Sequence, residues 1–494
     1  MEASRRSFIF RDVNQGGTHS YRKSLACWLR NCDDIINCCD TLQSSALCKR
    51  MQRPPGPKPH FLIGNMPLAS RDPLTVMTRW AREYGDIFYY RAGWIHVYFF
   101  NRPDLIETVL VRNHSNLLKD HVVRNSRWFF GNGLLTSEGD EWKRQRRLTQ
   151  PAFHRERVAS YDAIMTNYAE QMLSHWRDGA ILDVHQEMMN LALRIVVRTL
   201  FGVEAGNAEM ISDALNTMMR HTAGVRLLLP PIARKLPLPG MGKVRGAVRQ
   251  LNDSVSAIIS KRQARAEHDS KDLLSMLITA RDEDGSTMTA TEVRDQVLTF
   301  LIAGHETTAL ALSWTWYLLS RNPEVENKLH QELDTVLGRR APNAADLLSL
   351  VYTERVIKES MRLYPPAWSL AREVAKEFEV ERYRIPAGAN LVMSQWILQR
   401  DPRFFRDPDN FEPDRWGSEA SQQLPRFAYF PFGGGPRQCI GAGFAMMEAV
   451  LLLATIATRF RLRVVDDHPI VAVPSFTLRP KNGIRMELKQ RFPH

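Results

Sequence analysis

One long apolar stretch constrains the fold more than any other part of the sequence. A helical pattern covers residues 290–321, and within it residues 297–319 contain only His305 and Glu306 as groups that carry charge near neutral pH. A stretch of this length could cross a membrane. However, residues 304–308 (Gly-His-Glu-Thr-Thr) place polar groups at its middle, where lipid penalises them most. We therefore predict a helix buried through the centre of a large folded protein.

The composition is typical of a folded chain. The protein has 494 residues, of which 44% are hydrophobic and 24% charged, and a formal net charge of +12. These values exclude a disordered, a collagen-like and a multi-span membrane protein. No run of Lys and Arg reaches the density of a nucleic-acid-binding tail. We therefore expect no nucleic-acid partner, but a locally basic face for an acidic protein or an anionic lipid surface.

The first 53 residues differ from the rest. They carry five of the six cysteines but no sustained apolar run, so they predict neither a signal peptide nor a transmembrane anchor. They resemble a transit peptide only weakly, and we predict a disordered extension over 1–53. The proline-rich stretch 54–59 cannot form a helix and marks the start of a single folded domain over 54–494.

The folded part is predicted to be mainly α-helical with a small β portion, an α+β fold. Alternating apolar residues over 87–91 and 94–100 predict a β-hairpin. The apolar, basic stretch 227–240 would cover a substrate entrance, touch a membrane or serve as an ordinary connecting loop. Helical periodicity predicts further helices over 74–84, 103–112, 139–148, 157–176, 184–201, 208–220, 243–267 and 271–281.

Cys439 is the one cysteine after residue 48, which excludes a disulfide framework for the folded part. A lone cysteine is a small buried hydrophobe, a nucleophile or a metal ligand. Cys439 lies in the glycine-rich loop 430–441, directly before an apolar helix, and Arg437 adds positive charge. Glycines let a backbone approach a flat group, and a helix N-terminus stabilises a thiolate. This setting favours a thiolate ligand to iron, as in thiolate-ligated haem.

The polar middle of the long helix has two interpretations. In the structural one, Thr307 and Thr308 bond back to carbonyls one turn earlier and Glu306 reaches solvent. In the functional one, the helix is locally widened and presents an acid and an alcohol to chemistry that needs protons. This segment taken alone favours the structural interpretation.

Five motifs, in their expected order, resemble those of the cytochrome P450 monooxygenases. Phe432-x-x-Gly435-x-Arg437-x-Cys439-x-Gly441 resembles the haem-binding loop of that family. Residues 303–308 resemble its oxygen-activating patch, 142–146 its propionate-binding helix, and Glu359-x-x-Arg362 with Arg415 its buried ion pairs. The resemblance covers residues 54–488. It implies the cytochrome P450 fold, with haem between the long central helix and the cysteine loop.

The resemblance also implies roles for the motif residues. Cys439 would ligate the iron of a haem b that is otherwise held non-covalently. Some fatty-acid ω-hydroxylases carry a haem-esterifying glutamate where this chain has Ala303, so no such ester is expected. Glu359, Arg362 and Arg415 would be structural, because a buried carboxylate needs paired cations. The expected haem contacts are Trp142, Arg146, Arg372 and Arg437 at the propionates, and Ala303, Gly304, Phe432 and Gly441 elsewhere.

The reaction implied by the resemblance inserts one atom of O2 into a hydrophobic molecule. Thr307 would hydrogen-bond the oxygen and Glu306 would relay protons, and this pair favours an O2-dependent monooxygenase over a peroxygenase or isomerase. Electrons from NAD(P)H would come through a separate ferredoxin, flavodoxin or flavoprotein reductase, docked at Lys143, Arg144 and Arg147. We expect a monomer in the bacterial cytoplasm, with the mitochondrial matrix as the alternative and at most peripheral membrane contact.

The substrate is predicted only by chemical class. Wall residues would come from 122–130, 227–238, 298–303, 367–370 and 475–476, and their apolar character indicates a fatty acid, a terpenoid or a steroid. The sequence of the polar patch, residues 303–308, resembles most the fatty-acid-hydroxylating branches of the family, and this mildly favours a fatty acid as the substrate. Hydroxylation of a terpenoid is kept as an equal alternative. A haem-thiolate gas sensor, an isomerase without monooxygenase activity and a cysteine nucleophile stay open as alternatives. The expected pocket residues are Phe129, Leu298, Ile302, Ala367, Trp368 and Phe476.

Overall fold

A computed structural model of the protein describes residues 53–66, 72–202, 211, 213–215, 217, 240–264, 272–465 and 469–492. They belong to the unit Arg53–His494. Apart from Arg53, the predicted extension 1–53 lies outside the described residues. Most of the predicted helix 208–220 and all of the stretch 227–240 except its last residue also lie outside them.

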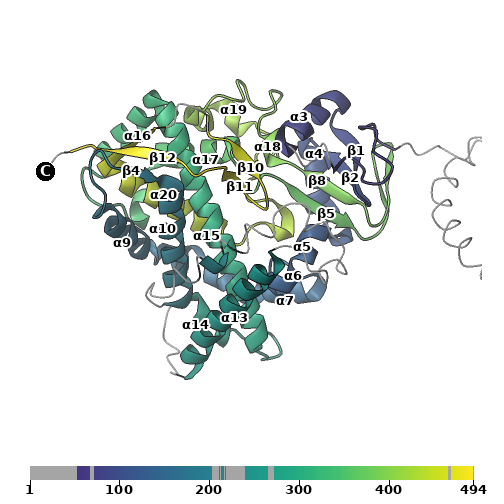
Figure 1. The fold of residues 1–494 in the computed structure, drawn as a ribbon, viewed down its shortest axis with the longest axis horizontal. Coiled ribbons are helices and arrows are strands. Elements are labelled where there is room, and N and C mark those ends of the chain that lie inside the picture. The colour runs from purple at the N-terminus through teal and green to yellow at the C-terminus, as the bar shows by residue number, and fades with distance from the viewer. Residues whose placement is uncertain are drawn as a thin grey trace, which may run out of the picture. The chain divides into compact units, whose positions relative to one another are not determined.

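One long helix, α15 (Ala290–Arg321), runs through the middle of this unit with the bounds that the sequence predicts (Figure 1). It begins at a capping box, in which the Thr289 hydroxyl accepts from the Glu292 amide and the Glu292 carboxylate accepts from the Thr289 amide. It packs on α10 (Val184–Phe201), α17 (Val351–Leu363) and α20 (Ala442–Arg459). It is therefore the buried core helix that the sequence predicts.

The helix α20, rather than α15, is the one described helix that is long and apolar enough to cross a membrane by length and composition. Its residues from Met447 to Thr458 are buried. They pack against α9 (Asp162–Leu173), α15 and α17 inside the protein. An apolar core helix has this composition for the same reason that a membrane span does, because no side of it meets water.

The apolar residues of α15 belong to two separate hydrophobic clusters. Residues 293–302 contribute to a cluster with α10, α13 (Met241–Ala264) and α14 (Leu273–Thr279). Residues 309–319 contribute to a second cluster with α9, α17 and α20. The polar stretch 303–308 therefore lies between the two clusters, where apolar side chains do not surround the helix on every side.

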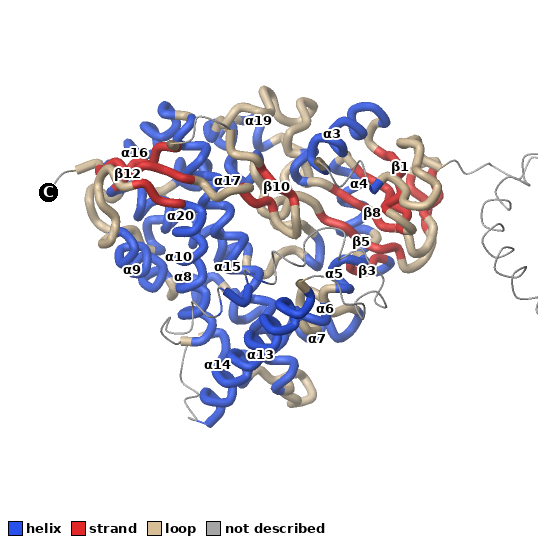
Figure 2. The backbone as a smooth tube through the Cα atoms, viewed as in Figure 1, coloured by secondary structure: helices blue, strands red, loops and turns tan. Residues whose placement is uncertain are grey.

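Two sheets carry most of the strands (Figure 2). The five-stranded sheet has the order β1-β2-β8-β5-β3, and its β1–β2 pair confirms the predicted hairpin. Strand β3 pairs antiparallel with β5, so that Lys119 lies opposite Arg372. The strands are β1 (Ile87–Ala92), β2 (Ile95–Phe100), β3 (Leu117–Lys119), β4 (Ile181–Asp183), β5 (Leu370–Val374), β6 (Phe378–Val380), β7 (Tyr383–Ile385), β8 (Asn390–Met393), β9 (Phe460–Val464), β10 (Ala472–Pro474), β11 (Leu478–Pro480) and β12 (Arg485–Gln490).

Two predicted helices are corrected. The prediction of a single helix over 157–176 is wrong. One helix ends at Ala159 and another begins at Asp162, and between them the ring of Tyr161 packs in the core against Phe444. The segment 103–112 is α-helical only over α4, and then forms a π-helical turn over Thr108–Arg112. The remaining helices are α3 (Pro73–Tyr84), α4 (Pro103–Glu107), α5 (His121–Asn125), α6 (Arg127–Phe130), α7 (Gly139–Thr149), α8 (Arg155–Ala159), α9 (Asp162–Leu173), α16 (Pro323–Val336), α18 (Gln395–Leu398) and α19 (Glu419–Gln422).

Candidate active site

A cavity of about 370 Å³ lies where the predicted motifs meet. The polar stretch of α15, the loop 431–441, helix α7, strands β3 and β5 and the turn between β10 and β11 contribute to its wall. The structure thus brings together segments that are more than 300 residues apart in the sequence. The predicted site residues on this wall are Trp142, Arg146, Ile302, Ala303, Gly304, Glu306, Thr307, Ala367, Arg372, Phe432, Arg437, Cys439, Gly441 and Phe476.

Thr307 presents its hydroxyl at the cavity wall while bonding to its own helix. Its Oγ1 donates to the Ala303 carbonyl at 2.6 Å, as the structural interpretation predicts. The same hydroxyl oxygen keeps lone pairs with which it can accept a further hydrogen bond from the cavity. Gly304 serves packing, because a Cβ there would lie 3.1 Å from Val196 of α10.

Glu306 is buried, and the expectation that it reaches solvent is wrong. Its Oε1 accepts from the Thr477 hydroxyl at 2.6 Å and from Nε of Arg479. The adjacent His305 is bound to the Met189 carbonyl at 3.0 Å, and burial lowers the pKa of His305 to about 4. The acid is therefore held by an ion pair in the interior beside a neutral histidine.

Cys439 lies on the cavity wall and is open to the cavity, although protein surrounds it. Burial raises the pKa of the thiol, whereas the Gly441 amide and the charges of Arg146 and Lys119 lower it. The Cys439 amide donates to the Phe432 carbonyl at 3.0 Å and so fixes the loop. A positively charged species at the thiol would favour the thiolate further.

The glycines before Cys439 fit the loop against the protein itself. Gly435 has φ +67°, and a Cβ there would lie 1.9 Å from the Leu110 carbonyl oxygen. A Cβ at Gly434 would lie 2.3 Å from the Phe427 ring. The sequence predicted that the glycines of this loop make room for a flat ligand. For Gly434 and Gly435 this is corrected, because the missing side chains make room for Phe427 and for the Leu110 carbonyl.

Two predicted propionate residues hold the cysteine loop in place. Arg146 of α7 donates from Nη1 to the Gln438 carbonyl at 2.9 Å. Arg437 is paired with the Glu138 carboxylate, donates to the Ser137 carbonyl at 3.1 Å, and lies 4.4 Å from the centre of the Trp142 ring. These contacts place both guanidinium groups at the edge of the cavity.

Lys119 is a site residue that sequence reasoning missed. It lines the cavity and is paired with Arg372 on the neighbouring strand. Burial is the main cause that lowers the pKa of Lys119 to about 7, and the charges of Arg372 and Arg437 lower it further. Burial likewise lowers the pKa of Arg372 to about 10. A lysine in a short strand gives no signal in the sequence, and only the pairing of β3 with β5 reveals it.

The residues on this wall fit a haem. Four described cations lie on the wall, namely Lys119, Arg146, Arg372 and Arg437. Among the described residues, only two acids lie beside them, Glu138 and Asp120, so the cations outnumber the acids. Two propionates would supply the missing negative charge. A soft thiolate donor and apolar walls complete the requirements of a haem with a cysteine ligand.

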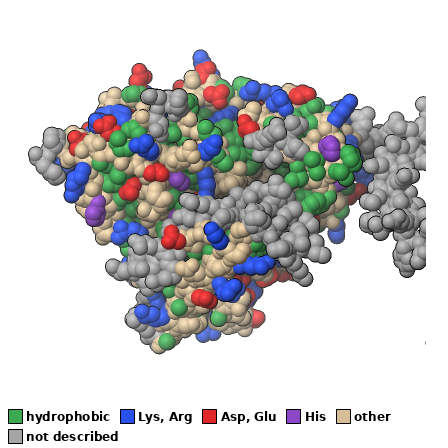
Figure 3. Space-filling view, in the orientation of Figure 1, with side chains coloured by type: hydrophobic (Ala, Val, Ile, Leu, Met, Phe, Trp, Pro, Cys, Tyr) green, Lys and Arg blue, Asp and Glu red, His purple; other side chains and the backbone are tan. Residues whose placement is uncertain are grey.

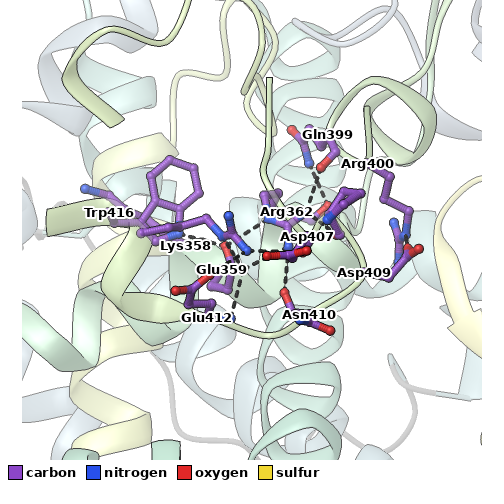
Figure 4. A network of polar contacts seen from close by, with 12 residues as sticks. Lys358, Glu359, Arg362, Gln399, Arg400, Asp407, Asp409, Asn410, Glu412 and Trp416 are labelled. Carbon is purple, nitrogen blue, oxygen red and sulfur yellow. Dashed lines mark hydrogen bonds and ion pairs between the residues drawn. The ribbon is translucent and has the colours of Figure 1, made fainter. Parts of the chain in front are cut away.

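The predicted structural triad forms a closed network behind the cavity (Figure 4). The fully buried Glu359 carboxylate accepts from Arg362 at 2.8 and 2.9 Å, from Arg415 at 2.8 Å and from Trp416 at 2.9 Å. Arg362 also donates to the carbonyls of Gln399, Pro408 and Asn410. The network therefore ties α17 to the segment 399–416 and has no group on the cavity wall.

The three cations of the predicted docking surface on α7 are paired with acids. Arg144 pairs with Asp282 and Glu292, and Arg147 pairs with Asp282 and Glu283. The exposed Lys143 faces Asp140 at 2.8 Å. These ion pairs reduce the unpaired positive charge on α7, and the docking of a redox partner there stays a prediction.

Three of the six expected pocket residues lie off the wall. Phe129 packs on Phe130, Leu298 is buried among the residues of α10, α13 and α14, and the Trp368 indole donates to the Ser475 carbonyl at 2.9 Å. Other apolar residues also lie on the wall, and these are Leu134, Leu135, Val196, Leu200, Phe300 and Leu370. Of these, Phe300 and Leu370 fall within the predicted ranges 298–303 and 367–370, whereas the rest lie outside every predicted range.

Comparison with known proteins agrees with this site. The family model described as "Cytochrome P450" matches residues 54–486. The chain is 38% identical to "Cyclooctatin synthase" of Streptomyces melanosporofaciens, over 84% of this chain and 91% of that protein. It is 35% identical to "Pentalenene oxygenase" of Streptomyces avermitilis, over 89% and 97%. It is 38% identical to "Cyclooctat-9-en-7-ol 5-monooxygenase" of Streptomyces melanosporofaciens, over 83% and 89%.

The chain therefore belongs to the cytochrome P450 family, which confirms the resemblance and the fold class. It is a haem-thiolate monooxygenase that uses haem b with a cysteine-thiolate iron ligand, O2 and electrons from a partner. Cys439 is the only cysteine within the matched residues. The match favours the monooxygenase over the gas sensor, the isomerase and the cysteine nucleophile.

Replacing Glu359 by Ala is expected to destabilise the protein by about 3–5 kcal/mol, because Arg362 then stays buried without its carboxylate. Urea unfolding and the haem content of purified protein measure the loss. Glu354→Gln is the matched control on the same helix, since Glu354 pairs with Lys358 at the surface.

If Glu359→Ala does not fold, Glu359→Gln, which keeps the shape of the side chain, takes its place in the same measurement. Equal unfolding curves for the Glu359 and Glu354 variants would contradict the account of this network.

Proposed function

We propose that this monooxygenase hydroxylates a cyclic terpenoid, with Cys439 as the iron ligand. The observation that carries the proposal is the distribution of charge on the cavity wall. The described cations of the wall, Lys119, Arg146, Arg372 and Arg437, belong to α7, the sheet and the cysteine loop. The described wall residues from α10 and α15 include no cation, and the only charged group there is the acid Glu306.

This distribution favours a terpenoid over a fatty acid. A fatty-acid carboxylate buried in the cavity would need a cation or several donors. The described cations are the ones that the haem propionates would occupy. A hydrocarbon skeleton needs only apolar contact, which Val196, Leu200 and Ile302 supply. The names of the similar proteins, which refer to pentalenene and cyclooctat-9-en-7-ol, support the same substrate class.

The wall residues have defined tasks towards the haem in this proposal. Cys439 would bind the iron, and Lys119, Arg146, Arg372 and Arg437 would hold the propionates, with Trp142 stacked on Arg437. Ala303, Gly304, Phe432 and Gly441 would contact the ring. When bound, the haem supplies activation of O2, for which thiolate ligation donates electron density.

Thr307 and Glu306 would handle protons for this chemistry. The Thr307 hydroxyl can rotate from the Ala303 carbonyl towards the cavity, where it accepts or donates a hydrogen bond. The Glu306 carboxylate, on the neighbouring position of α15, can accept a proton and pass it on through water. Both groups are held on a rigid helix, which fixes where the proton is delivered.

The electron supply is proposed to be a separate ferredoxin, flavodoxin or flavoprotein reductase in the bacterial cytoplasm, acting on a monomer. Because Arg144 and Arg147 are already paired with acids, the docking surface would use other cations as well. Figure 3 shows Lys and Arg side chains spread over the visible face among acidic ones. Association would then depend on salt, as for other charge-steered complexes.

A spectral screen of the purified haem protein tests the substrate class. Cyclic terpenes are expected to produce the type-I spectral shift of a bound substrate. Fatty acids of similar carbon number are expected to bind at least about tenfold more weakly, because the described part of the wall offers their carboxylate no cation beyond those assigned to the propionates. Mass spectrometry of the turnover mixture would then find a hydroxylated terpenoid. Tight, productive binding of fatty acids with no terpene shift would overturn the proposal.

Lys119 is expected to add a pH dependence to haem binding. Its pKa is lowered to about 7 in the haem-free pocket, and anionic propionates would keep it protonated. Binding would then take up a proton between about pH 7 and pH 10, so this contribution to affinity is full below pH 7 and falls by at most about tenfold per pH unit above it.

Transfer of haem to excess apomyoglobin measures this effect. The ratio of haem loss in Lys119→Met to that in wild type should be largest near pH 6 and should shrink towards pH 9. Lys143→Met, on the exposed face of α7, is the control. A ratio independent of pH would mean that Lys119 does not meet a propionate.

A further inference from the structure

The turn between β10 and β11 touches both the cavity and the proposed proton-delivering acid. Phe476 of this turn lies on the cavity wall. Its neighbour Thr477 donates to Oε1 of Glu306 at 2.6 Å, and Arg479, two residues later, pairs with the same oxygen. Nothing in the sequence motifs connects these residues, which are about 170 positions from Glu306.

The backbone of this turn is fixed from both sides. The Trp368 indole donates to the Ser475 carbonyl at 2.9 Å, and the Trp314 indole donates to the Leu478 carbonyl at 2.9 Å. Within the turn, the Ser475 amide donates to the Thr477 carbonyl at 2.9 Å. These bonds tie the turn together, so a displacement of its backbone carries Phe476 and Thr477 with it.

Arg479 is the cation that faces Glu306. The other titratable groups around it are His185 and His305, and burial lowers the pKa of both, to about 4 for His305. The carboxylate of Asp183 accepts from the His185 amide at 3.1 Å. Both histidines are therefore neutral near pH 7, and among the described residues Arg479 supplies the charge that balances the buried acid.

Arg479 also connects the acid to the outside. Its side chain is 21% exposed, whereas that of Glu306 is 5% exposed. Its buried Nη2 has no hydrogen-bond partner among the described residues. A donor in this position can hold a water molecule between the solvent and the carboxylate.

We propose that Thr477 and Arg479 are positioning residues for the reaction, which hold the Glu306 carboxylate and couple its orientation to occupation of the cavity through the turn that carries Phe476. This inference rests on the proposed role of Glu306 in proton delivery. A substrate that presses on Phe476 shifts the turn and with it the hydroxyl that holds Oε1. Only a proton moves in the step concerned: it comes from hydronium in the solvent through water, is taken up by the Glu306 carboxylate and is passed on towards Thr307, and the electrons come from the redox partner.

The test uses the holoenzyme with its redox partner and a substrate identified by spectral shift. Thr477→Val removes the hydroxyl at constant shape, Arg479→Gln removes the charge, and Arg479→Lys keeps it. Lys481→Gln is the control, because Lys481 is an exposed cation just beyond β11. Product formed per NAD(P)H consumed, its pH profile and the spectral Kd of the substrate are measured for each.

Thr477→Val and Arg479→Gln are expected to lower product per NAD(P)H by about fivefold to a hundredfold, as displaced catalytic groups do, with the spectral Kd changed by less than about twofold. Arg479→Lys should restore most of the loss. In the double variant Glu306→Gln/Arg479→Gln the second change should cost little more, because the two residues act as one unit.

A readout without haem tests the coupling directly. In haem-free protein labelled with 13C at glutamate carboxyl groups, the Glu306 resonance, assigned with Glu306→Gln, should shift in Thr477→Val and not in Lys481→Gln. An apolar ligand in the cavity should shift it in wild type and not in Phe476→Ala. Absence of both shifts would overturn the inference.

The two levels of the proposal fail in different ways. If Glu306→Gln and Thr307→Ala lower product per NAD(P)H but Thr477→Val does not, the positioning inference is wrong and proton delivery by Glu306 stands. If Glu306→Gln leaves product per NAD(P)H and its pH profile unchanged, the proposed role of Glu306 is wrong and the inference falls with it. Should Arg479→Gln lose its haem, Thr477→Val decides alone.

Discussion

The buried carboxylate of Glu359 is the interaction on which the rest of the site depends. One acid with no exposure to water holds two guanidinium groups and an indole, which come from α17 and from the segment 413–416. A charge in this position is tolerated only because all its partners are present. Since a protein of this kind is stable by only about 5–15 kcal/mol, the network contributes a large part of what keeps the segment before the cysteine loop in place.

The long helix α15 gives the site its second fixed side. Apolar residues 293–302 and 309–319 anchor it in two clusters, and the polar stretch between them faces a cavity. Burial would penalise Glu306 there without a counter-charge, and Arg479 supplies one. The acid that we propose for proton delivery is therefore held by a part of the chain that also touches the cavity through Phe476.

Local patterns in the sequence predicted much of this arrangement. The bounds of α15, the β1–β2 hairpin and the position of Cys439 before α20 follow from periodicity, turn residues and a motif in register. The features that were missed depend on contacts between distant segments. The register of β3 against β5 places Lys119 beside Arg372, and the segment before α15 neutralises Arg144, and neither fact leaves a mark in the local sequence.

In the proposed function, Cys439 supplies the thiolate to a haem in this cavity. The most direct measurement is the absorption spectrum of the purified protein after reduction and exposure to CO. Ligation by Cys439 should give the long-wavelength Soret band that distinguishes thiolate from imidazole ligation, and this band should be lost in Cys439→Ser. A band at the shorter wavelength of a histidine-ligated haem in wild type, or an unchanged band in Cys439→Ser, would contradict ligation by Cys439.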